Sequence, residues 1–543
     1  ESSFQWILEG NLVVPTGNPF QGGSNGNDDD DDKEESTSST SSSSNSSSSS
    51  SRIIHLNEKL HIKVDYVLCV DHHGIIAVIE PSTTFWDKYK YAATSSTTEC
   101  DTYISTDSSI ETLKQNHPGY VNLNDCSSSS SSSFLCPGLV DLHIHAPQYA
   151  FCGTGTDRPL MGPDGWLETY TFPAEAALKD DRQRTRVVYD AVVKRTLDFG
   201  TTTAMYFATT AVDPTKTLVD TAIRRGQRAL IGKVSMDRNA PDHYIQSAQQ
   251  NIEGTKEIIE YIESHPDPKQ QPNVNNSKTT NSSSTTTTPS TTLLPLVLPT
   301  VIPRFIPTCT PELLEGLGQI VQQRQKENKP IWVTSHVSES NDEVEFAQQL
   351  IRQDYASSDD NNDDVTTTLT DTQVFDKHNL LTDRCVLAHG VLLSEQDFEL
   401  LAQRGAAVGH CPLSNFYFAG HALPTHHMSS LNTKTTPTTK GSSGGVKVGL
   451  GTDVAAGYSP SIMDSARTAI LASLSLKQQQ EGQQRILDQQ EQQHPTKKKA
   501  KKLNTADPTL DYRHSFYLAT LGGANALNLQ SSIGSLQVGM EFD

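Results

Sequence analysis

The sequence predicts an α/β protein, a (β/α)8 barrel with a small β domain before it and several polar surface insertions. Eight short apolar runs alternate with stretches of helical periodicity such as 184–199 and 312–326, as in a parallel barrel where a helix follows each strand. Side chains that can bind a metal end four of these runs. The alternation of apolar runs and helical stretches resumes after each polar insertion. The runs span 135–145, 201–208, 228–236, 294–305, 331–337, 384–392, 405–411 and 446–454.

The residues before the barrel favour short β-strands. Strand-like pieces cover 4–15, 53–69 and 74–80, and Asp71-His72-His73-Gly74 is typical of a turn. The tail 533–543 is expected to begin another strand region. Because the chain begins at Glu1 rather than Met, we expect a fragment. The predicted parts are a small β domain over 1–133, the barrel over 134–525, and a truncated segment over 526–543 that returns to the β domain.

Five segments are predicted to be surface insertions rather than parts of the fold. They are rich in Ser, Thr, Asn, Gln, Asp or Lys and lack apolar periodicity, so they cannot bury enough surface to offset the entropy of ordering. The lysine run 497–502 could be a nuclear-import signal, but a solvated charge run is the better interpretation. The insertions lie near 22–52, 266–292, 354–372, 424–445 and 477–507.

The charge, the cysteines and the lengths of the apolar runs argue against several classes of protein. The 543 residues carry a formal net charge of −21, and an acidic chain without a broad basic face argues against nucleic acid as a partner. The eight cysteines show no regular spacing, so we expect reduced thiols and a cytosolic location. No apolar run approaches the roughly 18 residues of a membrane span, and no signal peptide is visible.

Metal-capable side chains close several of the apolar runs. His143 and His145 lie two residues apart and therefore point to the same side of a strand. His336, His389 and Asp453 close the fifth, sixth and eighth runs. A single His or Asp at one of these positions more often has a structural role than a metal-binding role. Because the carboxyl ends of barrel strands meet at the functional face, the set predicts a metal site.

This arrangement resembles the amidohydrolase superfamily, which carries H-x-H on strand one, His on strands five and six, and Asp on strand eight. The fourth run ends Pro303-Arg304-Phe305 without the lysine of the binuclear members, so the resemblance implies a mononuclear site. The implied ligands of one metal ion per chain are His143, His145, His336 and Asp453, with water completing the site. Three neutral nitrogens and a carboxylate suit zinc, and iron is an alternative.

Glu339, three residues after His336, indicates a deaminase. Deamination of a heteroaromatic ring needs a water activated by the metal and a carboxyl group that carries protons to the ring and to the leaving ammonia. We expect Glu339 to shuttle these protons, although a Glu at a helix start is also favoured by the helix dipole. Asp453 can take a proton from the water, and His389 is expected to hydrogen-bond the water or the intermediate.

Within the superfamily the chain is similar to the guanine deaminase family over nearly all residues outside the insertions. That resemblance implies hydrolysis of guanine to xanthine and ammonia, one zinc ion, a homodimer, and a purine pocket formed by Gln148, Arg304 and Phe305 together with the metal-site residues. The similar segments are 137–149 (PGLVDLHIHAPQY), 166–175 (WLETYTFPAE), 300–305 (TVIPRF), 335–344 (SHVSESNDEV), 387–390 (LAHG), 409–415 (GHCPLSN), 449–458 (GLGTDVAAGY) and 520–523 (TLGG).

Two other functions stay open at this point. Another mononuclear deaminase, acting on 8-oxoguanine, cytosine or an adenosine derivative, would share the metal site and Glu339 and differ only in the pocket. A scaffold, for example one that binds the cytoskeleton, would use the barrel as a platform. The intact ligand set argues against a scaffold without activity.

Overall fold

The computed structural model shows two compact units, Leu139–Asn528 and a second unit formed by Glu1–Gly138 with Leu529–Asp543. Each unit has its own hydrophobic core. No helix among the residues described has the length and apolarity needed to cross a bilayer. The structure describes residues 4–20, 34–36, 52–57, 59–95, 114–115, 117–123, 133–265, 294–355, 369–431, 445–493 and 507–543.

The smaller unit is built on a mainly antiparallel sheet with the order β2-β3-β4-β1-β6. The central pair is β1 (Trp6–Pro15) and β4 (Leu60–Val70). β1 confirms the piece expected at 4–15, and the piece expected at 53–69 forms two antiparallel strands, β3 (Arg52–Asn57) and β4. Alternate residues of β1 such as Leu8, Leu12 and Val14 are buried in its core. The other elements are β2 (Glu34–Ser36), β3 (Arg52–Asn57), β5 (Ile76–Pro81), α1 (Ser82–Ser95), β6 (Tyr120–Asn122) and β7 (Phe134–Leu135).

The end of the chain packs into this smaller unit without forming a strand. The expectation of a strand within 533–543 is wrong, because the only ladder contact described there is an isolated bridge between Ile75 and Glu541. Leu536 and Met540 nevertheless join the core of the sheet. Hydrophobic burial and backbone hydrogen bonds between residues 539–542 and 74–76 therefore hold this segment, although it forms no regular strand.

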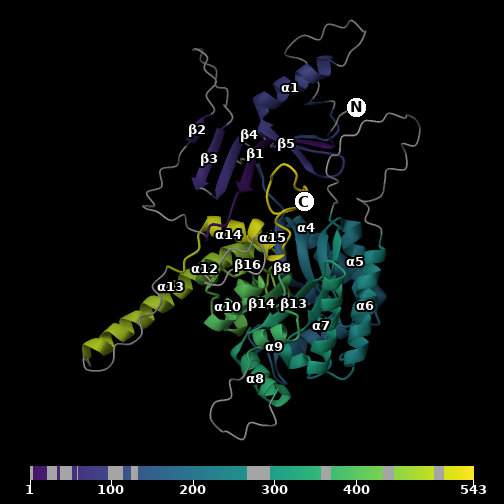
Figure 1. Cartoon of the computed structure of the whole chain (residues 1–543), viewed down its shortest axis with the longest axis vertical. Helices are drawn as coiled ribbons and strands as arrows, with labels where there is room; N and C mark the ends of the chain where they lie inside the picture. The colour runs from purple at the N-terminus through teal and green to yellow at the C-terminus, as the bar shows by residue number, and fades with distance from the viewer. Residues whose placement is uncertain are drawn as a thin grey trace. The chain divides into compact units, whose positions relative to one another are not determined.

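The larger unit is a parallel barrel with the strand order β16-β15-β14-β13-β12-β10-β9-β8, and helices surround it (Figure 1). All eight apolar runs become strands, as predicted. Two backbone hydrogen bonds join β8 to the residues after β16, from Asp453 N to His143 O at 2.8 Å and from His145 N to Val454 O at 3.0 Å. The strands are β8 (Leu139–His145), β9 (Thr201–Phe207), β10 (Arg228–Gly232) with β11 (Val234–Ser235), β12 (Val297–Pro303), β13 (Trp332–Val337), β14 (Cys385–His389), β15 (Ala407–His410) and β16 (Lys447–Leu450).

Several helices begin or end at residues that satisfy the free backbone groups. Ser247 and Gln250 form a capping box at the start of α6. Gly226 and Gly405 end α5 and α10 in the left-handed conformation, which glycine adopts without strain. The helices expected at 184–199 and 312–326 are confirmed as α4 and α7. The barrel helices include α4 (Arg182–Asp198), α5 (Val212–Arg225), α6 (Ala248–Ser264), α7 (Pro311–Lys326), α8 (Asn341–Tyr355), α9 (Asp371–Lys377), α10 (Glu395–Arg404), α11 (Pro412–Phe418), α12 (Thr425–Ser430), α13 (Ile462–Gln493), α14 (Tyr512–Ala519) and α15 (Leu521–Ala526).

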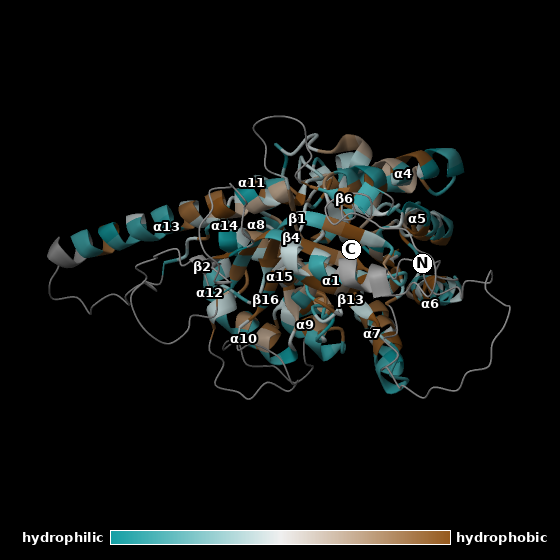
Figure 2. Cartoon of the chain, turned by 90° about the horizontal axis from the view of Figure 1, so that it is seen from above, coloured by the Kyte–Doolittle hydropathy of each residue, from teal (hydrophilic) through white to brown (hydrophobic). Residues whose placement is uncertain are grey.

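Several segments predicted as insertions contain regular structure. The largest correction concerns 477–507, because residues up to Gln493 continue α13, whose outer part is mostly hydrophilic (Figure 2). Glutamine has a good helix propensity but gives no apolar periodicity, so the pattern did not indicate a helix. The segment 424–445 begins with α12, and 354–372 overlaps the end of α8 and the start of α9. The segment 22–52 includes β2 and the first residue of β3, whereas 266–292 and the lysine run 497–502 lie outside the described residues.

Candidate metal centre and active site

The histidine pair of β8 lies at the carboxyl end of the first barrel strand. His143 and His145 are 0% and 3% exposed, and they share one face because side chains alternate along a strand. The last residues of neighbouring strands meet at this end. His336 comes from β13, His389 ends β14, and Asp453 follows β16.

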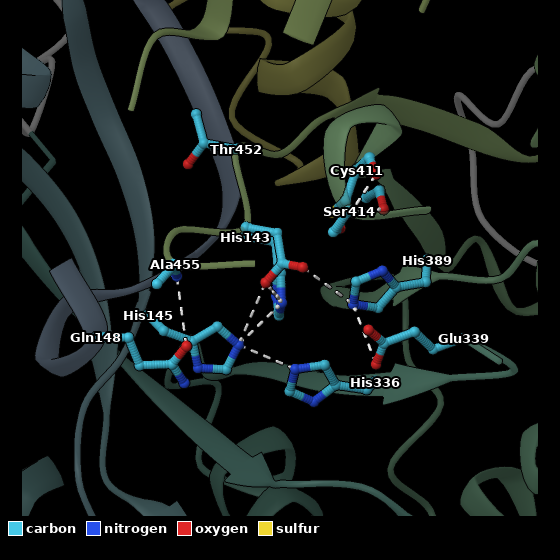
Figure 3. Close-up of polar contacts among 12 residues, drawn as sticks. His143, His145, Gln148, His336, Glu339, His389, Cys411, Ser414, Thr452 and Ala455 are labelled. Atoms are coloured by element: carbon cyan, nitrogen blue, oxygen red, sulfur yellow. Dashed lines mark hydrogen bonds and ion pairs between the residues drawn. The ribbon is translucent and has the colours of Figure 1, made fainter. Parts of the chain in front are cut away.

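Three imidazole rings converge through their Nε2 atoms (Figure 3). His145 Nε2 lies 3.2 Å from His143 Nε2 and 3.0 Å from His336 Nε2. The carboxylate of Asp453 approaches the same point, with Oδ1 at 3.2 Å from His143 Nε2. Burial lowers the pKa of each of the three imidazoles well below its usual range, so the rings are neutral.

These donor atoms suit a cation. The Nδ1 of His336 lies 2.7 Å from the carbonyl oxygen of Arg304, and a carbonyl only accepts, so Nδ1 carries the proton and Nε2 presents a lone pair. Oδ2 of Asp453 is buried without a hydrogen-bond partner among the described residues. The sets that could hold a metal are His143, His145 and His336, and His143, His389 and Asp453.

His389 stands beside both carboxylates of the site. Its Nδ1 lies 3.0 Å from Asn415 Oδ1, which only accepts and therefore fixes the proton on Nδ1. Its Nε2 faces Glu339 Oε2 at 3.6 Å and Asp453 Oδ2 at 3.8 Å. Figure 3 shows His389 directly beside Glu339, on the side of the site opposite His145. Such a nitrogen can bind either a metal or a water molecule.

Glu339 reaches the pocket from the turn between β13 and α8. It is 5% exposed, and burial, reinforced by the charge of Asp453, raises its pKa well above the usual range of a carboxyl. A carboxyl group in that state holds its proton and can act as an acid. The sequence predicted that Glu339 lies near the candidate metal site, and in the structure its side chain lines the same pocket as His336 and Asp453.

Two acidic residues that the sequence analysis missed hold this turn. Ser338 adopts a left-handed conformation with φ 47°, and its backbone N–H donates to Asp371 Oδ2 at 3.1 Å. The backbone N–H of Glu339 donates to Glu343 Oε2 at 3.1 Å. Asp371 comes from α9 and has no recognisable motif, whereas Glu343 of α8 lies within the segment 335–344 that is similar to the guanine deaminase family, but nothing in that segment indicated its contact with the Glu339 backbone.

The expected purine-recognition residues line the same pocket. Gln148 comes from the 3-10 turn Ala146–Phe151 after β8, and Arg304 and Phe305 follow β12. All three are buried. The remaining lining residues are His145, Leu160, Trp166, Leu167, His336, Glu339, Asp453 and Ala456.

A further residue without a predicted role joins two of these side chains. Glu175 on α3 (Phe172–Ala176) is completely buried. It accepts hydrogen bonds from Gln148 and from both terminal nitrogens of Arg304. The sequence contained Glu175 within a segment similar to the guanine deaminase family, but nothing in the segment indicated a contact with Arg304, which is 129 residues away.

Comparison with known proteins agrees with this architecture. The model of the amidohydrolase family matches residues 134–543, so the chain belongs to the amidohydrolase family. Guanine deaminase of Dictyostelium discoideum is 33% identical over 424 residues, which cover 78% of this chain and 75% of the relative. Guanine deaminase of Homo sapiens is 36% identical over 415 residues, which cover 76% and 72%. These relatives place the chain, within that family, in the guanine deaminase group.

Solved structures share the fold. A crystal structure of guanine deaminase from C. acetobutylicum, with guanine bound in its active site, superposes with a TM-score of 0.63. The two sequences are 23% identical, and the match covers 99% of this chain and 89% of the other. The likeness supports the barrel and its accessory unit as a shared architecture.

Proposed function

We propose that this chain catalyses the hydrolytic deamination of guanine to xanthine and ammonia. One observation carries the proposal: a single buried pocket combines a histidine–aspartate cluster, a carboxylic acid that holds its proton, and a guanidinium. The curated relatives named guanine deaminase support the choice of substrate. A homodimer, implied by the family resemblance, and a cytosolic location, expected from the irregular spacing of the cysteines, are part of the proposal.

The metal site in this proposal holds one zinc ion. His143, His145, His336 and Asp453 would be its ligands, because three neutral imidazole nitrogens and a carboxylate converge there. A bound zinc ion acts as a Lewis acid and lowers the pKa of water to about 7. His389 lies beside this cluster, where it can hold the attacking water or the oxygen that forms from it.

The protein groups carry the protons of the reaction. Water adds to C2 of guanine, and Asp453 accepts one of its protons. Glu339, which begins protonated, donates to ring nitrogen N3. The proton on Asp453 then passes to the amine, which leaves as ammonia, and the second water proton restores Glu339. Xanthine keeps the oxygen on C2 and the proton on N3.

The polar edge of the pocket suits an oxopurine. Guanine presents the acceptors O6 and N7 on one edge, and a guanidinium matches such a pair bidentately. Arg304 offers these donors from a buried position, and Phe305 can wall the pocket beside the flat ring. An amine on that edge would leave the buried donors of Arg304 unpaired, so it would be rejected.

The test combines metal content with ammonia release by the full chain. We expect about one zinc ion per chain and ammonia from guanine, in clear preference to 8-oxoguanine, cytosine and adenine. A H143A/H145A double variant should lose both the metal and the activity. The matched control is H72A/H73A, which removes two exposed histidines of the smaller unit. A parent chain that prefers cytosine, or a double variant that keeps its metal, would contradict the proposal.

A further inference from the structure

Glu175 is a buried carboxylate that the proposed reaction does not use. It lies on the short helix α3 and is 0% exposed. It does not line the pocket itself, but its partners Gln148 and Arg304 do. A buried carboxylate is costly unless it is fully paired, so its contacts determine what it does.

The two oxygens of Glu175 are shared among three side chains. Oε1 accepts from Gln148 Nε2 at 2.7 Å and from an Arg304 terminal nitrogen at 3.2 Å. Oε2 accepts from the other Arg304 terminal nitrogen at 2.8 Å and from the Tyr244 hydroxyl at 2.5 Å. Burial and the charge of Glu175 raise the pKa of Tyr244 well above its usual range, so the tyrosine keeps its proton and donates.

This pairing fixes the orientation of the Gln148 amide. A carboxylate only accepts, so the Nε2 group must face Glu175. The backbone N–H of Ala455 only donates, and it reaches Gln148 Oε1 at 3.3 Å on the other side (Figure 3). The amide therefore cannot exchange its ends without losing both contacts. One N–H of Nε2 stays available as a donor of fixed position.

The same carboxylate clamps the guanidinium. Both terminal nitrogens of Arg304 are engaged in a bidentate pair, and the guanidinium carbon lies 5.2 Å from the centroid of the Phe172 ring. Burial opposes the charge of Arg304, but the field of Glu175 raises its pKa above the usual value. Arg304 is therefore a permanent cation with one orientation, and its remaining N–H groups are donors only.

We propose that Glu175 is the specificity-positioning residue of this pocket. By fixing Arg304 and Gln148 as hydrogen-bond donors, it makes the pocket select purines that carry an oxo group over purines that lack one. This inference rests on the proposed function, because it assumes that the ligand of the pocket is a purine. Glu175 acts through its two partners and does not itself touch the ligand.

Equilibrium binding tests this role without turnover. The probes are hypoxanthine, which carries the oxo group but no amine to lose, and unsubstituted purine, which lacks both. Calorimetry on the zinc-loaded parent chain should show hypoxanthine binding about 10-fold to 100-fold tighter than purine, as expected for one good bidentate contact. In E175Q that ratio should fall to within about threefold of unity, with zinc content unchanged.

The matched control makes the same chemical change nearby. Glu168, in the turn Leu167–Thr171 that precedes α3, is half-buried and outside this network, so E168Q should keep the parent ratio. Equal binding of the two probes by the parent chain, or an unchanged ratio in E175Q, would overturn the inference. Absence of ammonia release from guanine, with a ratio that still depends on Glu175, would instead refute only the proposed function.

A double-mutant cycle excludes a merely structural effect. Because E175Q leaves the buried charge of Arg304 without its partner, it can reduce folding yield, whereas E175Q/R304M removes both charges and leaves no uncompensated one. If Glu175 acts mainly through Arg304, then E175Q should change the hypoxanthine-to-purine ratio in the parent background and change it clearly less in the R304M background, where only the effect through Gln148 remains. Equal effects in both backgrounds would overturn the inference.

Discussion

At the residue scale, the site is assembled from side chains at the ends of strands where the backbone itself is constrained. Ser338, His389 and Asp453 all adopt left-handed conformations, with φ of 47°, 71° and 49°. Such conformations cost about 1–3 kcal/mol each for residues other than glycine. They turn the chain sharply after β13, β14 and β16, and the turns direct Glu339, His389 and Asp453 toward one point.

The first prediction concerns the proton carrier. E339Q should retain the metal and lose about 10²–10⁴-fold in kcat, because an amide keeps the size of the carboxyl group but cannot transfer its proton. The measurement is ammonia release together with elemental analysis of the purified chain. E345Q, which changes an exposed residue of the same helix α8, is the control and should keep the parent activity. Near-normal turnover in E339Q would assign Glu339 to structure.

The second prediction concerns Lys233, the residue that separates β10 from β11, whose amine is buried. Its Nζ donates to Asn251 Oδ1 at 2.8 Å and to the Val234 carbonyl at 3.2 Å. Burial lowers the pKa of Lys233 from 10.5 to about 7. Between these values the unfolded chain binds a proton that the folded chain has released, so the free energy of unfolding should rise with pH, by about 1.4 kcal/mol per pH unit.

Chemical denaturation of the parent and K233M between pH 7 and pH 9 measures this effect. The difference in unfolding free energy between the two chains should shift in favour of the parent as the pH rises. K256M, which changes an exposed lysine of α6, should follow the parent. Parallel pH profiles for the parent and K233M would show that the amine is protonated in the folded chain.

Residues at equivalent positions of the repeating strands could be predicted from the sequence. Residues whose role depends only on tertiary contacts could not. His143, His336 and Asp453 could be predicted together because parallel strands end at one face. Glu175 could not, since its partners come from segments far along the chain and a single glutamate on a short helix has no characteristic spacing. The roles of the predicted site residues stay predictions, although the structure brings these residues to one pocket and the metal cluster beside it.

At the element scale, apolar periodicity located the strands well and polar helices poorly. β12 lies within the run 294–305 and β14 within 384–392, because a buried barrel strand is apolar on both faces. α13 has buried residues near its start, such as Ala469 and Ala472, but exposes Leu471 and Ile486 at 62% and 55%. Its outer part has no apolar face to pack, so its sequence resembles that of a loop.

The third prediction is that the outer part of α13 can be removed. Lys477 Nζ and Asp507 Oδ2 are 2.9 Å apart, so the two flanks of the segment already lie together. A chain in which 480–505 is replaced by a short Gly-Ser linker should fold and keep its activity within about twofold, because little apolar surface is lost. The measurements are expression, thermal unfolding and ammonia release.

Substitution within the packed part of the same helix is the control. Ala469 is 0% exposed, and A469D would bury an unpaired charge, which should lower the free energy of unfolding by several kcal/mol. If the shortened chain fails to fold while the parent folds, the outer part of α13 has a structural partner that its exposure does not reveal.

At the scale of the whole barrel, the candidate metal ligands connect its first strand to its last. His143 and His145 lie on β8, His336 on β13, and Asp453 after β16, so the site is complete only when the early and late strands have come together. An unfolded chain does not hold these groups in place, and metal binding is therefore coupled to folding of the entire unit. Stability of the barrel should depend on zinc even though the site occupies one end of it.

The last prediction follows from this coupling. Zinc at about 1,000 times its dissociation constant should stabilise the folded chain by roughly 4 kcal/mol, because it binds the folded state preferentially. Removal of the metal with a chelator should lower the midpoint of thermal unfolding by several degrees, and added zinc should restore it. H143A/H145A should unfold at one temperature with or without zinc, whereas H72A/H73A should respond like the parent. A zinc response that survives in H143A/H145A would mean that the stabilising metal binds elsewhere, and the ligand set proposed here would then be wrong.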